Sequence, residues 1–252
     1  MKFDIVKTNI VNVSADAIVL PANSELKEGS GASKAIFKAA GRKNLTKACK
    51  KIGFCEVGSA VPTLAYDLDA NYIIHAVVPK WIDGNHSEYD LLSSAYLSAL
   101  QVADILGCES IAFPLLASGN NGYDLALAFQ IAKESIESFT GTKIKRVVLV
   151  LFGDHITSIV KGCGYEVLEI PENLKKEELK LAHEAKVKKI AEDGKEIAQT
   201  FLEDQIQKGL EYLKDEKNRE KVLGAGIAIA QIASRAVKRE PLNQKDKRKR
   251  TK

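Results

Sequence analysis

The chain has 252 residues, of which 45% are apolar, so it can bury one good core and support an additional module. Its net charge of +4 is mild and unevenly spread, with a balance of −2 over residues 1–171 and +6 over the remainder. The excess positive charge therefore belongs to the C-terminal part, and the net charge of residues 1–171 gives no support to nucleic-acid binding there.

The four cysteines lack CxxC spacing and lie in or beside apolar segments, which is typical of buried free thiols rather than of a disulfide framework. The first ten residues mix charged and apolar side chains and offer no apolar core for a signal peptide. Val222–Ala236 is about fifteen residues long, whereas a membrane-spanning helix needs about 20. We therefore expect a cytoplasmic protein that does not bind membranes.

Short apolar, β-branched runs alternate with segments whose apolar residues recur at helical intervals. In chain order the expected strands are Phe3–Ile5, Ala17–Leu20, Ala60–Leu64, Tyr72–Val78, Ser110–Leu116, Arg146–Leu151 and Glu166–Ile170. The expected helices are Ser33–Cys49, Leu91–Ile105, Leu125–Phe139 and Ile156–Cys163. Strands that are apolar on both faces and bounded by helices predict a three-layer α/β/α domain. The two opening strands look like a hairpin, so the sheet is expected to be mixed, although mostly parallel.

The composition changes at Pro171, and residues 172–240 are rich in Lys and Glu with almost no strand signal. An imperfect apolar stripe predicts helices there that pack against each other, the α/β domain or another copy. Residues 241–252 are too polar to pack and predict a basic, disordered tail. The expected organisation is an α/β domain over residues 1–171, a charged α-helical region over 172–240 and the tail.

Two glycine-broken polar segments, GSGASKAIFKAAG (Gly29–Gly41) and FPLLASGNNGYD (Phe113–Asp124), each follow a predicted strand and lead into a predicted helix. Each therefore presents unpaired backbone N–H groups and a helix N-terminus, which suit phosphate. Two such loops predict a bound diphosphate, and hence a nucleotide-sized ligand. Taken singly, each loop also fits an ordinary strand-to-helix turn.

Two side chains near these loops are candidates for contact with a sugar. Asn23 leaves its strand at the carboxyl end, where ligands gather in α/β sheets, and its amide can both donate and accept hydrogen bonds. It fits the shaping of its own loop equally well. Tyr123 fits either a ring over a sugar or a ring packed beneath its loop.

Five stretches of the chain resemble the macro domain, the ADP-ribose-binding fold, and within it the bacterial branch of O-acetyl-ADP-ribose deacetylases and mono-ADP-ribosyl hydrolases. They run in the family order at the family spacing and are Asp16–Leu26, Gly29–Gly41, Val57–Trp81, Glu88–Leu100 and Ser110–Tyr123. The resemblance implies a macro-domain sandwich over roughly residues 1–170, with ADP-ribose or an ADP-ribosylated protein as the ligand.

The resemblance also implies a role for each matching residue. Asp16, with Ala17 beside it, would accept the adenine amino group, and Phe152 would lie against the adenine face unless it packs in the core. Asn23 would contact the distal ribose as the candidate catalytic residue, with Tyr123 near the same sugar. The diphosphate would be held, largely through backbone N–H groups, by Gly29, Ser30, Gly31, Ala32, Ser33, Ser118, Gly119, Asn120, Asn121 and Gly122.

Some positions depart from the hydrolytic pattern of this family. Ser33 stands where those relatives usually carry an acid that orients or deprotonates water, and an unassisted serine is a poor base. Leu20 replaces the first Asn of the usual Asn-x-x-Asn pair. Two other routes remain, namely water activated by the ligand's own phosphate, with Asn23 positioning the sugar, or a stand-in acid at Asp124 or Glu28.

The histidines give no sign of a metal site. His86, His155 and His183 are isolated from one another and from cysteine pairs, so neither a metal nor another cofactor is expected. His75 lies in the middle of an apolar strand, where a structural role with one ring nitrogen bonded to the backbone is expected.

Two functions therefore remain open, and both include ADP-ribose binding. One is an enzyme that removes ADP-ribose from protein or nucleic acid, or deacetylates O-acetyl-ADP-ribose. The other is a non-catalytic reader whose C-terminal helices recruit a partner or dimerise. A third hypothesis makes the basic region after residue 171 a nucleic-acid-binding arm.

Overall fold

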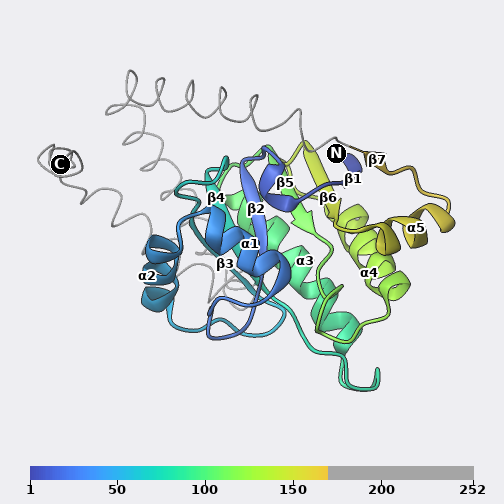
Figure 1. The fold of residues 1–252 in the computed structure, drawn as a ribbon, viewed down its shortest axis with the longest axis horizontal. Helices are drawn as coiled ribbons and strands as arrows, with labels where there is room; N and C mark the ends of the chain where they lie inside the picture. The colour runs from blue at the N-terminus through green and yellow to red at the C-terminus, as the bar shows by residue number, and fades with distance from the viewer. Residues whose placement is uncertain (170–252) are drawn as a thin grey trace, which may run out of the picture.

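The computed structural model describes residues 1–169, which fold around one seven-stranded sheet (Figure 1). In chain order its elements are β1 (Lys2–Lys7), the 3-10 helix η1 (Ile10–Asn12), β2 (Ala17–Ala22), α1 (Gly31–Ala39), α2 (Arg42–Ile52), β3 (Ala60–Leu64), β4 (Tyr72–Val77), α3 (Glu88–Ile105), β5 (Ser110–Pro114), α4 (Leu125–Ser138), β6 (Arg146–Leu151), α5 (Asp154–Gly162) and β7 (Leu168–Glu169). The helical region expected over 172–240, the tail 241–252 and the apolar segment Val222–Ala236 lie outside the described residues.

The strands lie in the order β3-β4-β2-β5-β6-β1-β7, and each neighbouring pair is parallel except β3 with β4. The mixed, mostly parallel sheet is therefore confirmed, but the opening hairpin is wrong. Strand β1 pairs with β6 and β7, while β2 pairs with β4 and β5. Residues 8–16, which include η1, pack their apolar side chains on one face of the sheet and so carry the chain back for a parallel β2.

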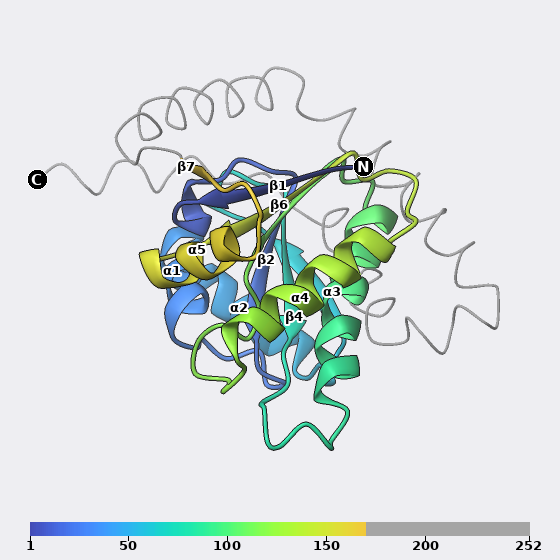
Figure 2. The same ribbon diagram turned by 90° about the vertical axis from the view of Figure 1, so that its right-hand side faces the viewer.

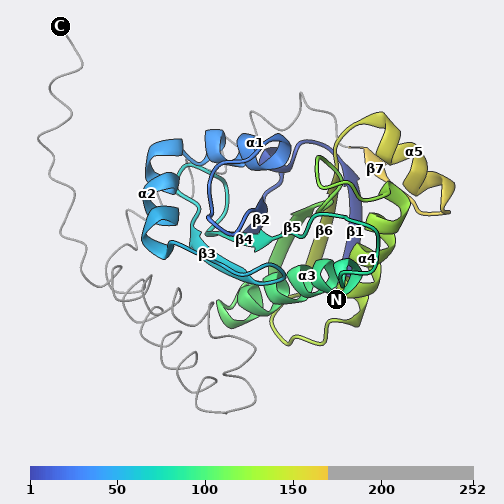
Figure 3. The ribbon, with the colours of Figure 1, turned by 90° about the horizontal axis from the view of Figure 1, so that it is seen from below.

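Helices cover both faces of the sheet, which confirms the three-layer α/β/α fold (Figure 3). One apolar cluster packs α3, α4 and α5 against the sheet, and a second packs η1, α1 and α2 against the other face. Alternate residues of β2 divide between them, since Val19 belongs to the first cluster and Ile18 to the second. Helices α3 and α4 lie side by side (Figure 2). Within residues 1–169, no helix has the length and apolar character needed to span a bilayer.

The single helix expected at Ser33–Cys49 is in fact two helices, α1 and α2, separated at Gly41. Gly41 has a φ of +85°, in the left-handed region that favours glycine, and a Cβ there would lie 2.7 Å from the Asp67 carboxylate. The backbone turn at Gly41 therefore ends the apolar periodicity that the sequence shows as continuous.

The parallel pairing brings the carboxyl ends of β1, β2, β4, β5 and β6 to one edge of the sheet. Ligands of open α/β sheets bind beyond this edge, in the loops that leave the strands. The segments that follow β2 and β5 are the two glycine-broken loops.

Candidate functional site

The two loops leave neighbouring strands and meet. Loop one (residues 23–30) joins β2 to α1, and loop two (residues 115–124) joins β5 to α4. Because β2 and β5 are adjacent and parallel, both loops begin at the same edge. The Asn120 side-chain amide donates a hydrogen bond of 3.3 Å to the Ser30 hydroxyl, which joins the loops directly.

Loop one is held by the side chain of Ser33, whose hydroxyl accepts a 3.0 Å hydrogen bond from the Gly29 backbone N–H. Ser33 is only 3% exposed. Helix α1 begins at Gly31, and the preceding Ser30 side chain caps none of its N–H groups. The first N–H groups of α1, from Gly31, Ala32 and Ser33, therefore remain without a helical partner, as an anion site requires.

Loop two turns sharply and leaves its middle exposed. The Leu116 N–H donates to the buried Tyr96 hydroxyl at 2.8 Å, and the next residue, Ala117, has a φ of +63°. The Ser118 hydroxyl then donates back to the Leu115 carbonyl at 2.7 Å. Gly119 follows on the surface, where an added Cβ would meet no atom within 4 Å.

The end of loop two is fastened to the segment that follows β4. The Asn121 side chain donates to the Pro79 carbonyl at 2.8 Å, and the Trp81 N–H donates to the Asn121 carbonyl at 2.7 Å. The Tyr123 hydroxyl donates to the Glu88 backbone carbonyl at 2.8 Å. The Tyr123 ring packs edge-on against the Trp81 ring, with 5.1 Å between the ring centroids. Asn121 and Tyr123 thus fasten the end of loop two to neighbouring segments. The backbone turns between them at Gly122, which has a φ of +83°.

Asn23 shapes its own loop. Its side chain accepts from the Lys27 N–H at 3.1 Å and donates to the Lys27 carbonyl at 2.9 Å. The side chain is exposed at the carboxyl end of β2, and an amide has a second N–H and a second lone pair. Asn23 can therefore shape loop one and still bond a sugar hydroxyl.

Both candidate stand-in acids are occupied. The Asp124 carboxylate caps α4 by accepting the N–H groups of Ala126 and Leu127, each at 3.0 Å. The Glu28 carboxylate pairs with the Arg42 guanidinium at 2.9 Å. Taking a proton from water would neutralise either carboxylate, and so weaken the cap of α4 at Asp124 and the ion pair with Arg42 at Glu28.

Asp16 and Ala17 are not brought to the loops. They stand at the amino end of β2, and this six-residue strand separates them from Asn23 by about 20 Å. The Asp16 carboxylate already accepts hydrogen bonds from the backbone N–H groups of Glu109 and Ser110, both at 3.0 Å. Ala17 is completely buried. The structure therefore separates both residues from the phosphate loops, and the carboxylate joins β2 to the start of β5.

Phe152 and Asn9 lie at the loop edge instead. Phe152 follows β6 and is 74% exposed, so it is not a core residue. Asn9 follows the neighbouring strand β1, where the Thr8 N–H donates to the Leu151 carbonyl at 3.1 Å. Sequence reasoning missed Asn9, whose only signal is an asparagine just after a strand. The side-chain oxygen of Asn9 accepts the Val11 N–H at 3.3 Å. The side-chain nitrogen has no hydrogen-bond partner among residues 1–169.

His75 is structural, but its partner is a side chain. It is fully buried, with Nε2 3.0 Å from the Thr63 hydroxyl, so the expected bond to the backbone is wrong. Burial lowers the pKa of His75 to about 3. A neutral imidazole inside the sheet cannot serve the chemistry at the loop edge.

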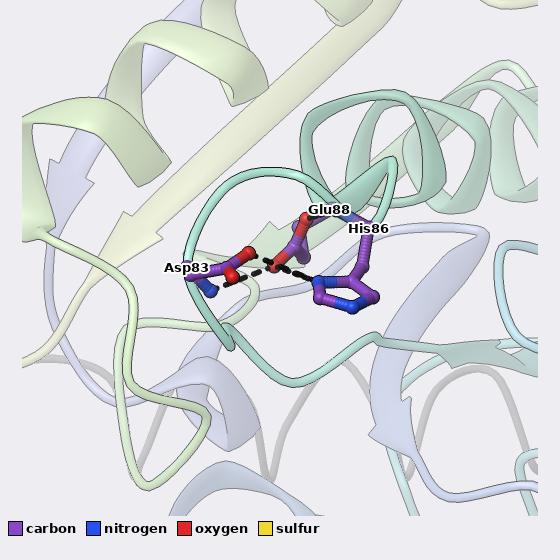
Figure 4. A group of neighbouring side chains, drawn as sticks. All are labelled: Asp83, His86 and Glu88. Carbon is purple, nitrogen blue, oxygen red and sulfur yellow. Dashed lines mark hydrogen bonds and ion pairs between the residues drawn. The ribbon is translucent and has the colours of Figure 1, made fainter.

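His86 forms a cluster with two carboxylates, that of Asp83 in the segment between β4 and α3 and that of Glu88 at the first residue of α3 (Figure 4). His86 Nδ1 lies 3.0 Å from the Asp83 carboxylate. The buried Glu88 carboxylate accepts the backbone N–H groups of Ile82, Asp83, Gly84 and His86 at 2.6–3.2 Å. With its oxygens so occupied, Glu88 organises this segment and is poorly placed to bind a metal ion as well.

These contacts predict an acid-dependent loss of stability. Burial by itself raises the pKa of Glu88, but the N–H groups that point at its carboxylate lower it from 4.5 to about 2. The stabilisation is therefore complete above pH 4.5 and is lost as the pH falls towards 2. Urea unfolding between pH 2 and 6 should show a smaller change for Glu88→Gln than for wild type, and parallel curves would contradict the role given to Glu88.

Comparisons with known proteins by sequence and by structure point to one family. A family model described as Macro domain matches residues 19–132. A Macro domain-containing protein from Caldanaerobacter subterraneus is 43% identical over 172 residues, which cover 67% of this chain and 98% of that protein. An O-acetyl-ADP-ribose deacetylase from Escherichia fergusonii is 40% identical over 142 residues, which cover 55% of this chain and 80% of the relative.

Solved structures that resemble this chain are macrodomains as well. A variant of the Oceanobacillus iheyensis macrodomain with ADPR has a TM-score of 0.59 at 30% identity, covering 63% of this chain and 89% of its own. The Trypanosoma brucei macrodomain in complex with ADP-ribose has a TM-score of 0.59 at 27% identity, covering 65% and 69%. The fold of this chain is thus similar to that of solved macrodomains. This chain belongs to the Macro domain family.

Proposed function

We propose that this chain binds ADP-ribose, free or attached to a protein, with the diphosphate between loops one and two. The observation that carries the proposal is the meeting of the uncapped N-terminus of α1 with the exposed backbone of loop two, joined by the Asn120–Ser30 hydrogen bond. Such a pair of backbone donors suits two phosphate groups. The macrodomains with ADPR and ADP-ribose support the ligand class.

The order of the strands supports a direction for the ligand. Loop one, loop two, Phe152 and Asn9 follow the neighbouring strands β2, β5, β6 and β1, which span about 15 Å at ordinary strand spacing. An extended nucleotide then has its distal ribose by Asn23, its diphosphate at the two loops and its adenine against Phe152. In this arrangement Asn9, rather than Asp16, offers the polar contact at the base end.

Phe152→Ala is expected to weaken ADP-ribose binding by about 1–3 kcal/mol, the usual contribution of one base stacked on an aromatic ring. Thermal stability should not change, because the ring is 74% exposed. Titration calorimetry with ADP-ribose measures the loss, and Phe54→Ala, which removes another exposed ring, is the control. If wild type and Phe152→Ala bind ADP-ribose with equal affinity, the adenine does not stack on Phe152.

A second candidate function is hydrolysis of O-acetyl-ADP-ribose or of mono-ADP-ribosyl esters, favoured by relatives named O-acetyl-ADP-ribose deacetylase. Ser33, Glu28 and Asp124 are all engaged within the protein. The water would therefore be activated by the ligand's own phosphate, which acts as the base, while Asn23 orients the distal ribose.

The alternative is a reader that binds ADP-ribose without turnover, with the residues after 171 recruiting a partner or a second copy. Incubation of the purified full-length chain with O-acetyl-ADP-ribose, with acetate followed over time, decides between the two. Repeated turnover supports the hydrolase. Stoichiometric binding without acetate release supports the reader.

A further inference from the structure

Positive charge is concentrated on one side of the described fold. Residues 31–55 contain seven basic side chains and no acidic one, although residues 1–171 have a balance of −2. All seven are exposed, two on α1 and five on α2, and these helices cover one face of the sheet (Figures 1 and 3). They are Lys34, Lys38, Arg42, Lys43, Lys47, Lys50 and Lys51, named here the basic face.

The basic face follows the helix repeat. Spacings of four, seven and eight residues place Lys43, Lys47, Lys50 and Lys51 on one side of α2, with a rise of about 6 Å for every four residues. Leu45 and Cys49, on the opposite side, are buried in the core. The lysines are thus aligned because the other side of α2 packs on the sheet.

The charges of the basic face are largely uncompensated. Arg42 pairs with Glu28, but among residues 1–169 no carboxylate lies within ion-pair distance of the six lysines. A row of like charges without counter-charges raises the local positive potential and attracts polyanions.

An exposed aromatic residue lies in the chain between α2 and a backbone contact with loop one. Phe54 follows the end of α2 and is 63% exposed. The next residue, Cys55, donates its backbone N–H to the Ser24 carbonyl of loop one at 2.9 Å. The backbone one residue after Phe54 is therefore held next to the start of loop one, and Lys34 and Lys38 lie on α1, the helix that loop one leads into.

We propose that the basic face and Phe54 bind a single-stranded nucleic acid, with the lysines contacting phosphates and Phe54 stacking on a base. Rows of cations beside an exposed aromatic ring are the usual means of holding single strands. A single strand offers both the phosphates and the unpaired bases that these two features would bind. Because the face adjoins loop one, the nucleic acid would enter at the distal-ribose end, so nucleic acid bearing ADP-ribose becomes a target class; this last step rests on the proposed function.

The test is fluorescence anisotropy of the full-length chain with a labelled 20-nucleotide single strand across a series of salt concentrations. The variant is Lys43→Gln/Lys47→Gln/Lys50→Gln, and the control is Lys2→Gln/Lys143→Gln/Lys145→Gln, which removes equal charge from exposed lysines at the opposite edge of the sheet. Losing three phosphate contacts should lower the salt slope by about 2 and weaken binding at least about tenfold, whereas the control should resemble wild type.

Phe54→Ala extends the test, since it should weaken binding of a single strand but not of a duplex, whose bases cannot stack on it. The proposal is overturned if the two triple variants bind alike, or if the wild-type chain binds anionic phosphatidylserine vesicles but not the oligonucleotide. Calorimetry with free ADP-ribose should give the same affinity for wild type and the α2 variant. Failure of ADP-ribose to bind wild type would remove the proposed function and leave the oligonucleotide result standing.

Discussion

Gly119→Glu is expected to abolish ADP-ribose binding while leaving the fold intact. Gly119 is exposed in loop two, its φ is not positive, and an added side chain would meet no atom within 4 Å. The fold should therefore tolerate glutamate to within about 0.5 kcal/mol. Like charges 4 Å apart near a protein surface repel by about 4 kcal/mol, so a carboxylate beside the diphosphate should lower affinity at least about a hundredfold.

Titration calorimetry and thermal unfolding measure the two effects separately. Gly162→Glu is the matched control, because Gly162 also has open space and no positive φ but lies at the end of α5. If Gly119→Glu binds ADP-ribose as tightly as wild type does, the diphosphate does not lie against loop two.

Tyr96→Phe is expected to destabilise the protein by about 1–3 kcal/mol, the cost of leaving a buried hydrogen-bonding group without its partner. Tyr96 is fully buried on α3, and its hydroxyl accepts the Leu116 N–H at 2.8 Å at the start of loop two. Burial, the main cause, raises the pKa of this hydroxyl, so it stays protonated. The substitution keeps the ring and its packing, so the loss isolates the hydrogen bond.

Tyr89→Phe removes a hydroxyl from the same helix and serves as the control. The Tyr89 hydroxyl donates to Glu134 at the surface, where water can replace the carboxylate, so its loss should change stability by less than about 0.5 kcal/mol. Urea unfolding of the two variants gives the comparison. Equal stabilities would show that loop two does not depend on its bond to Tyr96.

The elements of the fold could be predicted because they are local. Apolar periodicity locates the helices α3 and α4 and the buried strands β4 and β6 to within a few residues. Strand pairing is not local, since β1 lies beside β6, which comes about 140 residues later. The sequence of neither strand indicates which strand it pairs with. The break at Gly41 was equally hidden, because a glycine inside an apolar repeat is compatible with both one helix and two.

The phosphate loops could also be predicted, because glycines after a strand and before a helix have a direct physical meaning. The adenine role of Asp16 came from the family resemblance alone, whereas the parallel pairing places the loops at the carboxyl end of β2 and Asp16 at its amino end. Phe152 was open between the core and the surface, and its exposure decides for the surface. Glu88 was missed because its carboxylate binds four backbone N–H groups of the irregular segment just before it. Such a segment has no periodic pattern in the sequence.

Buried side chains hold the backbone of the loop edge in place. Ser33 holds Gly29, Tyr96 holds Leu116, and Glu88 holds the segment on which loop two rests. Backbone donors fixed in this way need little rearrangement when an anion arrives, which favours affinity. Binding of this kind would use backbone N–H groups and would not need the acid that Ser33 replaces.

Binding of ADP-ribose between loops one and two is decided by one calorimetric titration of the full-length chain. We predict a dissociation constant in the micromolar range, which corresponds to about 8 kcal/mol, and loss of the signal in Gly119→Glu. A titration of the folded wild-type chain that gives no heat at millimolar ADP-ribose would contradict the proposed function.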